Sequence, residues 1–271
     1  MNAKLFDPED RPLFTPKDFY GERGDSADAC IIVFSKEIYS SILDRFDCEK
    51  VGDMFTCGGS TPICVFKYED IRVAFYLSGI GSAIAGHQVI ESNWITGAET
   101  YVMFGSAGTL REDLTQGRYV IPDRAFRGEG MSAYYAPPGD YIEVRNARAV
   151  KKCFEELGLP NVTGAVWTVD AFYRESERLC DERRAEGCIA VEMELAGVQA
   201  VCDHHGLQLY DFLETGDVLR DESAAEPYSV GSLSAANHDA AKLEIALEII
   251  IRSQQNKYNE VNFDSFHECE N

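Results

Sequence analysis

The apolar residues of this chain fall into short runs of strand length, and longer segments with helical periodicity separate them. Runs such as residues 30–34 and 100–104 have the length and the β-branched or aromatic content of buried strands. The last helical segment places Leu243, Leu247 and Ile250 on one face, which we expect to pack against a sheet. This alternation predicts an α/β architecture with a mostly parallel sheet.

The pattern gives a definite set of elements along the chain. We expect strands at residues 30–34, 63–68, 71–77, 100–104, 118–122, 164–169, 188–191 and 207–213, and helices at 36–46, 84–97, 147–157, 175–186, 194–205 and 233–253. Residues 1–28 are rich in Pro, Gly, Asp and Glu and are expected to form an irregular N-terminal arm. A single domain follows at 29–255, and residues 256–271 are expected to form a weakly ordered tail.

Composition narrows the possible partners. A chain of 271 residues is long enough for one large α/β domain with a sizeable core. The sequence contains neither an apolar stretch of membrane-spanning length nor the layout of a signal peptide, so we expect a cytoplasmic protein. The formal net charge of −21 repels nucleic acid and anionic membranes, and we expect binding to neither. Any phosphate pocket must therefore attract its ligand through nearby donor groups, against the negative potential of the whole chain.

The nine cysteines are scattered singly, without a CxxC pair, which is typical of reduced cytosolic thiols. The run from Cys202 to His205 has metal-binding residue types, but it comes at the end of an expected helix, where His favours the negative end of the dipole. We therefore expect no metal site.

Polar and glycine-rich segments follow several of the expected strands. In parallel sheets ligands bind outside the carboxyl ends of the strands. The turns at 78–83 and 105–110 contain pairs of Gly that let a ligand approach backbone N–H groups, and Ser82 and Ser106 add hydroxyl donors. Neither turn has the spacing of a P-loop or of a dinucleotide fingerprint.

Carboxylates stand at three other strand ends. Glu192 and Glu194 lie between an apolar strand and an apolar helix face, and such groups suit the hydroxyls of a sugar. The alternative is that Glu194 is a solvated charge in the first turn of a helix. Asp170 precedes Phe172, whose ring would stack on a flat heterocycle or pack in the core. Asp217 would donate a proton or cap a turn.

Together these groups comprise an anion-binding turn, a sugar-binding carboxylate, an aromatic platform and a proton donor. These are the parts needed to cleave an N-glycosidic bond, because the leaving base must be protonated while the sugar is held.

At this point the chain resembles the purine nucleoside and uridine phosphorylase family, which includes the methylthioadenosine and adenosylhomocysteine nucleosidases. The resemblance covers residues 30–252 and rests on these motifs: Val191-Glu192-Met193-Glu194, Gly79-Ile80-Gly81, Gly105-Ser106-Ala107-Gly108, Asp170-Ala171-Phe172-Tyr173 and Gly216-Asp217. It implies a single-domain, three-layer fold with a mixed, mostly parallel, twisted sheet flanked by helices.

The resemblance also implies a role for each matching residue. Ribose would be bound by Glu194, Met193 and Ile80, and the base by Phe172, Trp167 and Arg178. Phosphate would be bound by Ser106 and Gly105, with Arg127, Arg124 and Lys36 as candidate cations, and Asp217 would protonate the base. Inorganic phosphate would be a co-substrate, and no cofactor is implied. The family forms dimers to hexamers, so we expect a homo-oligomer.

Two departures concern the phosphate end. The family's Gly-Asp-Pro is replaced by Phe34-Ser35-Lys36, and its phosphate-binding Arg by Met103. Glu37 is an offset match to the water-activating Glu of nucleosidases. The leading hypothesis is a pentosyltransferase that cleaves a purine or pyrimidine nucleoside with phosphate to give free base and ribose 1-phosphate. The alternatives are a hydrolytic nucleosidase and a non-catalytic nucleoside-binding or storage relative.

Overall fold

The computed structural model describes residues 5–8, 10–218 and 241–267, with side chains except at 216–218 and 256–267. Its strands are β1 (Ala29–Val33), β2 (Glu49–Thr56), β3 (Gly59–Tyr68), β4 (Ile71–Leu77), β5 (Thr100–Thr109), β6 (Tyr119–Gly128), β7 (Tyr141–Glu143), β8 (Asn161–Val169), β9 (Cys188–Glu192) and β10 (Gln208–Val218). They form one mixed sheet.

The centre of the sheet is parallel. β1 pairs in parallel with β4 and β5, β10 with β5, and β8 with β6 and β9. Antiparallel pairs complete it: β2 with β3, β3 with β4, β5 with β9, β6 with β7, and β6 with β10. Because β10 contacts both β5 and β6, the strands β5, β10, β6, β8 and β9 make a closed circuit. Within this circuit β6, β8 and β9 are parallel, so their carboxyl ends lie side by side, with Gly128 paired to Val169 and Thr168 paired to Glu192.

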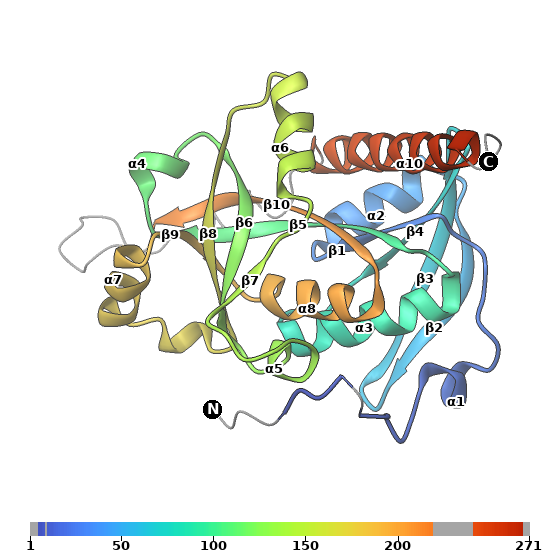
Figure 1. Ribbon diagram of the computed structural model, residues 1–271, viewed down its shortest axis with the longest axis horizontal. Coiled ribbons are helices and arrows are strands. Elements are labelled where there is room, and N and C mark those ends of the chain that lie inside the picture. Colours follow the sequence, from blue (N-terminus) through green and yellow to red (C-terminus); the bar gives the residue numbers. More distant parts are fainter. Residues whose placement is uncertain (1–4, 9, 219–240, 268–271) are drawn as a thin grey trace.

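Helices cover the sheet on two sides (Figure 1). The longer ones are α2 (Lys36–Arg45), α3 (Ser82–Thr96), α6 (Ala147–Glu156), α7 (Glu177–Ala185), α8 (Leu195–His205) and α10 (Ala241–His267), and the short ones are α1 (Pro16–Tyr20), α4 (Glu112–Thr115), α5 (Ser132–Tyr135) and the 3-10 turn η1 (Phe172–Arg174). Helices α3, α5 and α8 lie together on one side, and α2, α6 and α10 lie on the other. This is the expected three-layer arrangement.

Burial explains why the central strands read as continuous apolar runs. All five residues of β1 are buried, since helices cover both faces of a parallel strand at this position. The face of α10 that carries Leu243, Leu247 and Ile250 is buried, as its spacing predicts. His204 and His205 occupy the last turn of α8, which ends at the left-handed Gly206, and this confirms the interpretation of that run as a helix end.

Several boundaries differ from the expectation. β5 does not stop at residue 104, because its Gly-rich continuation stays paired with β10 and then with β9. β2 and β7 were not expected. The N-terminal arm contains the short helix α1, which begins after the capping residue Thr15 with Pro16 in its first turn.

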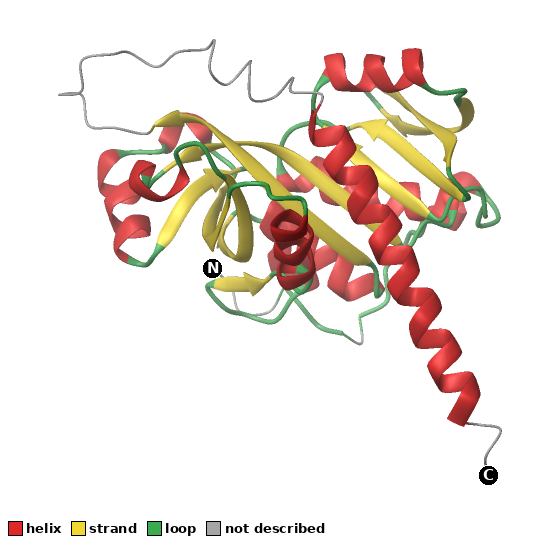
Figure 2. Ribbon diagram, turned by 90° about the horizontal axis from the view of Figure 1, so that it is seen from above, coloured by secondary structure: helices red, strands yellow, loops and turns green. Residues whose placement is uncertain are grey.

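The helix α10 continues to His267, through most of the expected tail, since its sequence from residue 241 contains neither Gly nor Pro. Figure 2 shows its last turns extending away from the sheet. The first part of the helix expected at 233–253 falls at residues 233–240, which lie outside the described residues.

Candidate functional site

The turn from β9 into α8 is held by the buried carboxylate of Glu192. Its Oε2 accepts hydrogen bonds from the backbone N–H groups of Glu194 at 2.6 Å and of Leu195 at 2.7 Å. The hydroxyl of Thr168, at the end of β8, donates to Oε1 and accepts from the N–H of Ala196 at 3.0 Å. Glu192 therefore satisfies N–H groups at the start of α8, and both of its carboxylate oxygens are used inside the protein.

Glu194 is oriented by a different part of the chain. Its Oε1 accepts a 2.6 Å hydrogen bond from the N–H of Gly81, in the turn that follows β4. The adjacent Ile80 is 58% exposed, and Met193 is half-buried. The structure thus brings together the three residues predicted to bind ribose, and Gly81 occupies one of the two carboxylate oxygens of Glu194.

Helices α3 and α8, which follow the turns after β4 and β9, contact each other closely at their first residues. The Ser82 N–H donates to the carbonyl of Met193 at 2.8 Å, and its hydroxyl donates to the carbonyls of Met193 and Glu194. A Cβ placed on Gly197 would lie 2.6 Å from Cβ of Ser82, so only Gly fits at that position of α8. The start of α3 is thereby fixed against the start of α8 (Figure 1).

Burial makes these carboxyl groups unusual acids. It raises the pKa of Glu194 to about 7, although the hydrogen bond from Gly81 acts in the opposite direction. Burial also raises the pKa of Glu192, and the charge of Glu194 adds to this rise. A third carboxyl, Asp211 on β10, is fully buried; burial and then the charges of Glu192 and Glu194 raise its pKa well above the usual value. The charges of Glu192 and Glu194 thus reach Asp211, and the charge of Glu194 reaches Glu192.

The predicted phosphate turn is the last part of β5. Ser106 and Gly105 are half-buried, and they are paired with Glu214 and Leu213 of β10. The ring of Phe34 reaches to 3.9 Å from the position of a Cβ on Gly105, which places the end of β1 beside this strand. After an irregularity in β10, the backbone of Asp217 pairs with Gly108. The side chain of Asp217 lies outside the described residues.

The residues predicted to bind the base are not all at the same place. Phe172 in η1 is 36% exposed, and its ring meets that of Tyr173 edge-on at 5.2 Å. Phe172 is therefore not a core residue and is accessible for stacking. Trp167 is buried in a secondary apolar cluster, and Arg178 is exposed on α7 and pairs with Glu182. Their roles in binding the base stay predictions.

Asp170 has a local role in the same region. Its Oδ2 accepts a 3.0 Å hydrogen bond from the N–H of Gly130, in the segment that follows β6. Within that segment Glu129 is buried and accepts from the N–H and the hydroxyl of Ser132. These contacts join the ends of β6 and β8 beside the expected base site.

Two of the candidate cations for phosphate, Arg127 and Lys36, differ in how far they are already hydrogen-bonded within the protein. Arg127 donates from Nε to the Ser132 hydroxyl at 2.8 Å and from Nη1 to the carbonyls of Pro137 and Gly139. Two of its three nitrogens are thus used within its own loop. Lys36 is exposed at the start of α2, directly beyond the end of β1.

Sequence reasoning missed one buried cation, Lys242. It lies in the first turn of α10, its side chain is 1% exposed, and its Nζ is 2.9 Å from Oε2 of Glu214. A helix periodicity allows a long amphipathic side chain at such a position, so the pattern gives no signal of its burial.

Sequence reasoning also missed Gln88, which accepts from the Ser78 hydroxyl at 2.8 Å and from the Gly79 N–H at 3.2 Å and so holds the turn beside Ile80.

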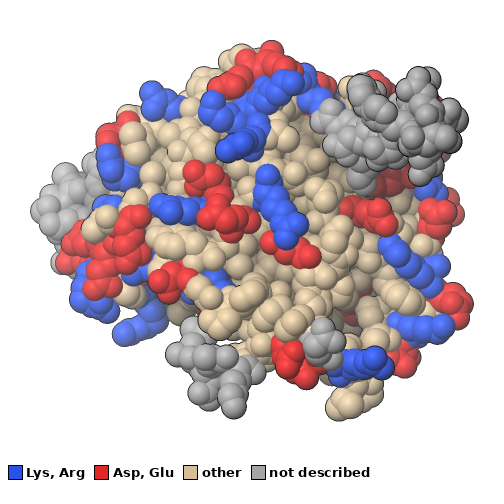
Figure 3. All heavy atoms as spheres, in the orientation of Figure 1, with Lys and Arg blue, Asp and Glu red and all other residues tan. Residues whose placement is uncertain are grey.

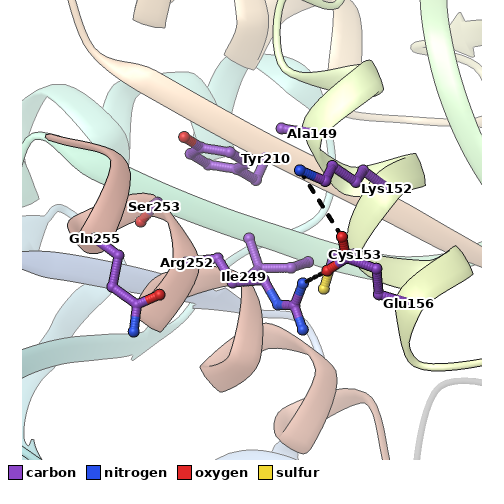
Figure 4. Close-up of a pocket in the computed structure, with 9 residues that line it drawn as sticks. All are labelled: Ala149, Lys152, Cys153, Glu156, Tyr210, Ile249, Arg252, Ser253 and Gln255. Atoms are coloured by element: carbon purple, nitrogen blue, oxygen red, sulfur yellow. Dashed lines mark hydrogen bonds and ion pairs between the residues drawn. The ribbon is translucent and has the colours of Figure 1, made fainter. Parts of the chain in front are cut away.

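A separate cavity of about 220 Å³ lies between α6 and α10. Figure 4 shows Lys152 and Arg252 directed toward Glu156, with the ring of Tyr210 from β10 close by. None of the predicted site residues lines this cavity, and its two cations are already paired with one carboxylate.

The surface adds little to the list of candidates. On the face in Figure 3, Lys and Arg side chains are interspersed with Asp and Glu. Within the part of the chain that the structure describes, no three His, Cys, Asp or Glu side chains are arranged to hold a metal ion. In the same residues, every helix is too short or too polar to cross a membrane.

Comparison with known proteins gives one family match. Residues 28–250 match the family described as "Phosphorylase superfamily". The chain is 26% identical over 153 residues to a DeoD-type purine nucleoside phosphorylase of Bacillus thuringiensis (strain Al Hakam). That alignment covers 55% of this chain and 65% of the relative, so the match spans less than two thirds of the relative's length.

Solved structures agree in fold. The native futalosine hydrolase of Helicobacter pylori strain 26695 superposes with a TM-score of 0.66 at 19% identity, covering 84% of this chain and 98% of that chain. An AMP nucleosidase from Bacteroides thetaiotaomicron VPI-5482 has a TM-score of 0.65 at 18% identity, covering 86% of this chain and 90% of that chain. These superpositions confirm the α/β fold class.

Proposed function

Because the chain belongs to the phosphorylase superfamily, we propose that it cleaves the N-glycosidic bond of a nucleoside and transfers the ribose to water. The family membership confirms the resemblance drawn from the sequence motifs. The observation that carries the proposal is the carboxylate of Glu194, which Gly81 holds through one oxygen at 2.6 Å. Its other oxygen is left to accept hydrogen bonds from the 2′- and 3′-hydroxyls of ribose.

In the proposed reaction the bond between C1′ and the base nitrogen breaks, and its electron pair leaves with the base. Asp217 protonates the base, and its backbone pairing with Gly108 supports a position close to the sugar. A water oxygen forms the new bond to C1′ and loses one proton. Glu37, in the first turn of α2 beyond β1, is the proposed acceptor of that proton. The exposed ring of Phe172 is the proposed platform for the base.

The charges near Ser106 favour water over phosphate. Binding a phosphate dianion calls for charge-assisted donors such as a free guanidinium. Of the cations considered for phosphate, Arg127 donates within its own loop through two of its three nitrogens, Arg124 lies over the ring of Tyr141, and Lys242 is paired with Glu214. Lys36 is exposed at the start of α2. Met103 stands where phosphorylases of the family carry Arg. A chain of net charge −21 offers no general attraction to compensate.

Phosphorolysis is the second candidate. The Gly105–Ser106 segment at the end of β5 favours it, because a half-buried serine next to a glycine suits an anion. The curated relatives matched at sequence level are also phosphorylases by name. In that case a phosphate oxygen forms the bond to C1′, and the product is ribose 1-phosphate.

The test is a panel of purine and pyrimidine nucleosides, each incubated in phosphate-free buffer and in buffer with excess phosphate. We expect base release at the same rate in both buffers, with free ribose as the sugar product. Base release only in the presence of phosphate would establish phosphorolysis instead. Nucleoside binding without base release in either buffer would identify a non-catalytic relative.

We also propose that the working form is a homo-oligomer. Ile80 and Ile84 are both at least half exposed beside the proposed ribose site, and such apolar side chains are suited to a protein interface. Light scattering of the purified chain measures this directly. A monomeric mass at micromolar concentration would contradict the proposal.

A further inference from the structure

Asp211 is a buried acid to which the proposed reaction gives no role. It lies in the middle of β10 with no exposed surface, and neither carboxyl oxygen has a hydrogen-bond partner among the described residues. Burying a carboxyl group without hydrogen bonds is unfavourable by a large margin, and such a group in a native structure requires an explanation. The neighbours of Asp211 supply one.

The β10–β5 ladder pairs Asp211 with Met103. Paired residues on parallel strands point to the same face of the sheet, so the two side chains are neighbours. Asp211 is also close enough to Glu192 and Glu194 for their charges to act on it. Asp211 is therefore the direct neighbour of Met103, the position at which a phosphate-binding Arg is missing, and lies within electrostatic reach of the proposed ribose ligand.

We propose that Asp211 is a specificity-determining residue that selects water over phosphate as the acceptor of the ribose, and this inference rests on the proposed function. Protonated, Asp211 contributes no positive charge that would hold an anion, and ionised, it repels one. A cation placed at residue 103 would pair with Asp211 and be lost to phosphate, because a buried carboxyl without partners captures an adjacent guanidinium. Asp211 thus acts against phosphate even if the missing Arg is restored.

If Asp211 only packed in the core, replacing it would leave the response of the cleavage rate to phosphate unchanged. The carboxyl groups around Asp211 are not arranged as a metal site, since among the described residues no three His, Cys, Asp or Glu side chains are placed to hold a metal ion.

The experiment compares Met103→Arg, Asp211→Asn and the double variant with the unmodified chain. Rates of nucleoside cleavage are measured as inorganic phosphate is increased, and ribose 1-phosphate is quantified. We expect no response to phosphate in the unmodified chain or in Met103→Arg. In the double variant we expect a rate increase of about 10-fold or more at saturating phosphate, the size of one charge-assisted interaction, together with ribose 1-phosphate. Met103→Gln with Asp211→Asn is the neutral control and should not respond.

Equal phosphate responses in Met103→Arg and in the double variant, including no response in either, would overturn the inference. A second measurement, the binding of inorganic phosphate followed by titration calorimetry, does not need turnover. Tighter phosphate binding by the double variant than by Met103→Arg supports the role of Asp211, and equal affinities contradict it. If the unmodified chain cleaves no nucleoside, the proposed function fails, while this binding comparison still tests Asp211.

Discussion

The carboxylate of Glu194 accepts a 2.6 Å hydrogen bond from the backbone N–H of Gly81, 113 residues away in the sequence. This contact joins the turn after β9 to the turn after β4 and fixes the direction of the side chain proposed to bind ribose. Gly81 has a φ of 102°, a conformation that favours glycine, so a side chain at this position would strain the turn that makes the contact.

Glu194→Gln should lower kcat/KM for nucleosides by roughly 10- to 100-fold, because it removes a charged acceptor worth about 1.5–3 kcal/mol. The shape of the side chain and the contact with Gly81 are retained, so the fold should be unaffected. Steady-state kinetics on the best substrate of the panel measures this. Glu99→Gln is the matched control, since Glu99 precedes β5 at the opposite edge of the sheet and is exposed. Equal losses in the two variants would rule out the assigned role.

The affinity for nucleoside should depend on pH. Burial raises the pKa of Glu194 to about 7, so the ionised fraction should rise from about one tenth at pH 6 to about nine tenths at pH 8. Only the ionised form accepts from both ribose hydroxyls, and KM should therefore fall as the pH rises through 7. The measurement is KM across this range, with Glu194→Gln expected to give a flat profile. A KM that is constant in the unmodified chain would contradict the prediction.

Gly197→Ala should destabilise the chain by about 1–3 kcal/mol, because its Cβ would lie 2.6 Å from that of Ser82 and would separate α8 from α3. Gly86→Ala is the control on the facing helix. There the nearest atom, at 3.0 Å, is the flexible end of Met131, and the gain in helix propensity offsets the crowding. Urea unfolding of both variants measures the difference, and similar stabilities would show that the junction is not tightly packed.

The two partners of the Lys242–Glu214 ion pair should differ in their effects on stability. Glu214→Ala leaves a fully buried ammonium group without its partner and should reduce the free energy of unfolding by about 3–5 kcal/mol. Lys242→Met should be milder, because Glu214 is 32% exposed and water can solvate its charge. Chemical denaturation of the two variants provides the test. A greater loss of unfolding free energy in Lys242→Met than in Glu214→Ala would contradict this prediction.

The sequence predicted the central layers of the fold because buried strands and amphipathic helices leave strong apolar patterns, as in β1 and α10. It predicted the end of β5 wrongly, since Gly105 and Gly108 usually mark a turn, whereas pairing with β10 keeps them in the strand. The edge strand β2 has mostly exposed or half-buried residues and left no apolar run to detect.

The candidate site was predictable to the extent that its residues are adjacent in sequence. Glu192 and Glu194 could be found from two charges between apolar segments, and the structure then shows that Glu192 accepts from N–H groups of its own turn while Glu194 accepts from Gly81. Their partners Thr168 and Gly81 could not be found this way, because only the tertiary fold brings them near. Asp211 did leave a signal, because it is the one acid of the strand expected at residues 207–213, but its unpartnered state depends on packing. The roles of Asp217, Phe172 and Ser106 stay predictions.

The most direct test of the central claim is the identity of the sugar released from a nucleoside when phosphate is present in excess. Chromatography with mass detection separates free ribose from ribose 1-phosphate in a single reaction. The proposed transfer to water predicts free ribose, formed at the rate seen without phosphate. Ribose 1-phosphate as the only sugar product would contradict it.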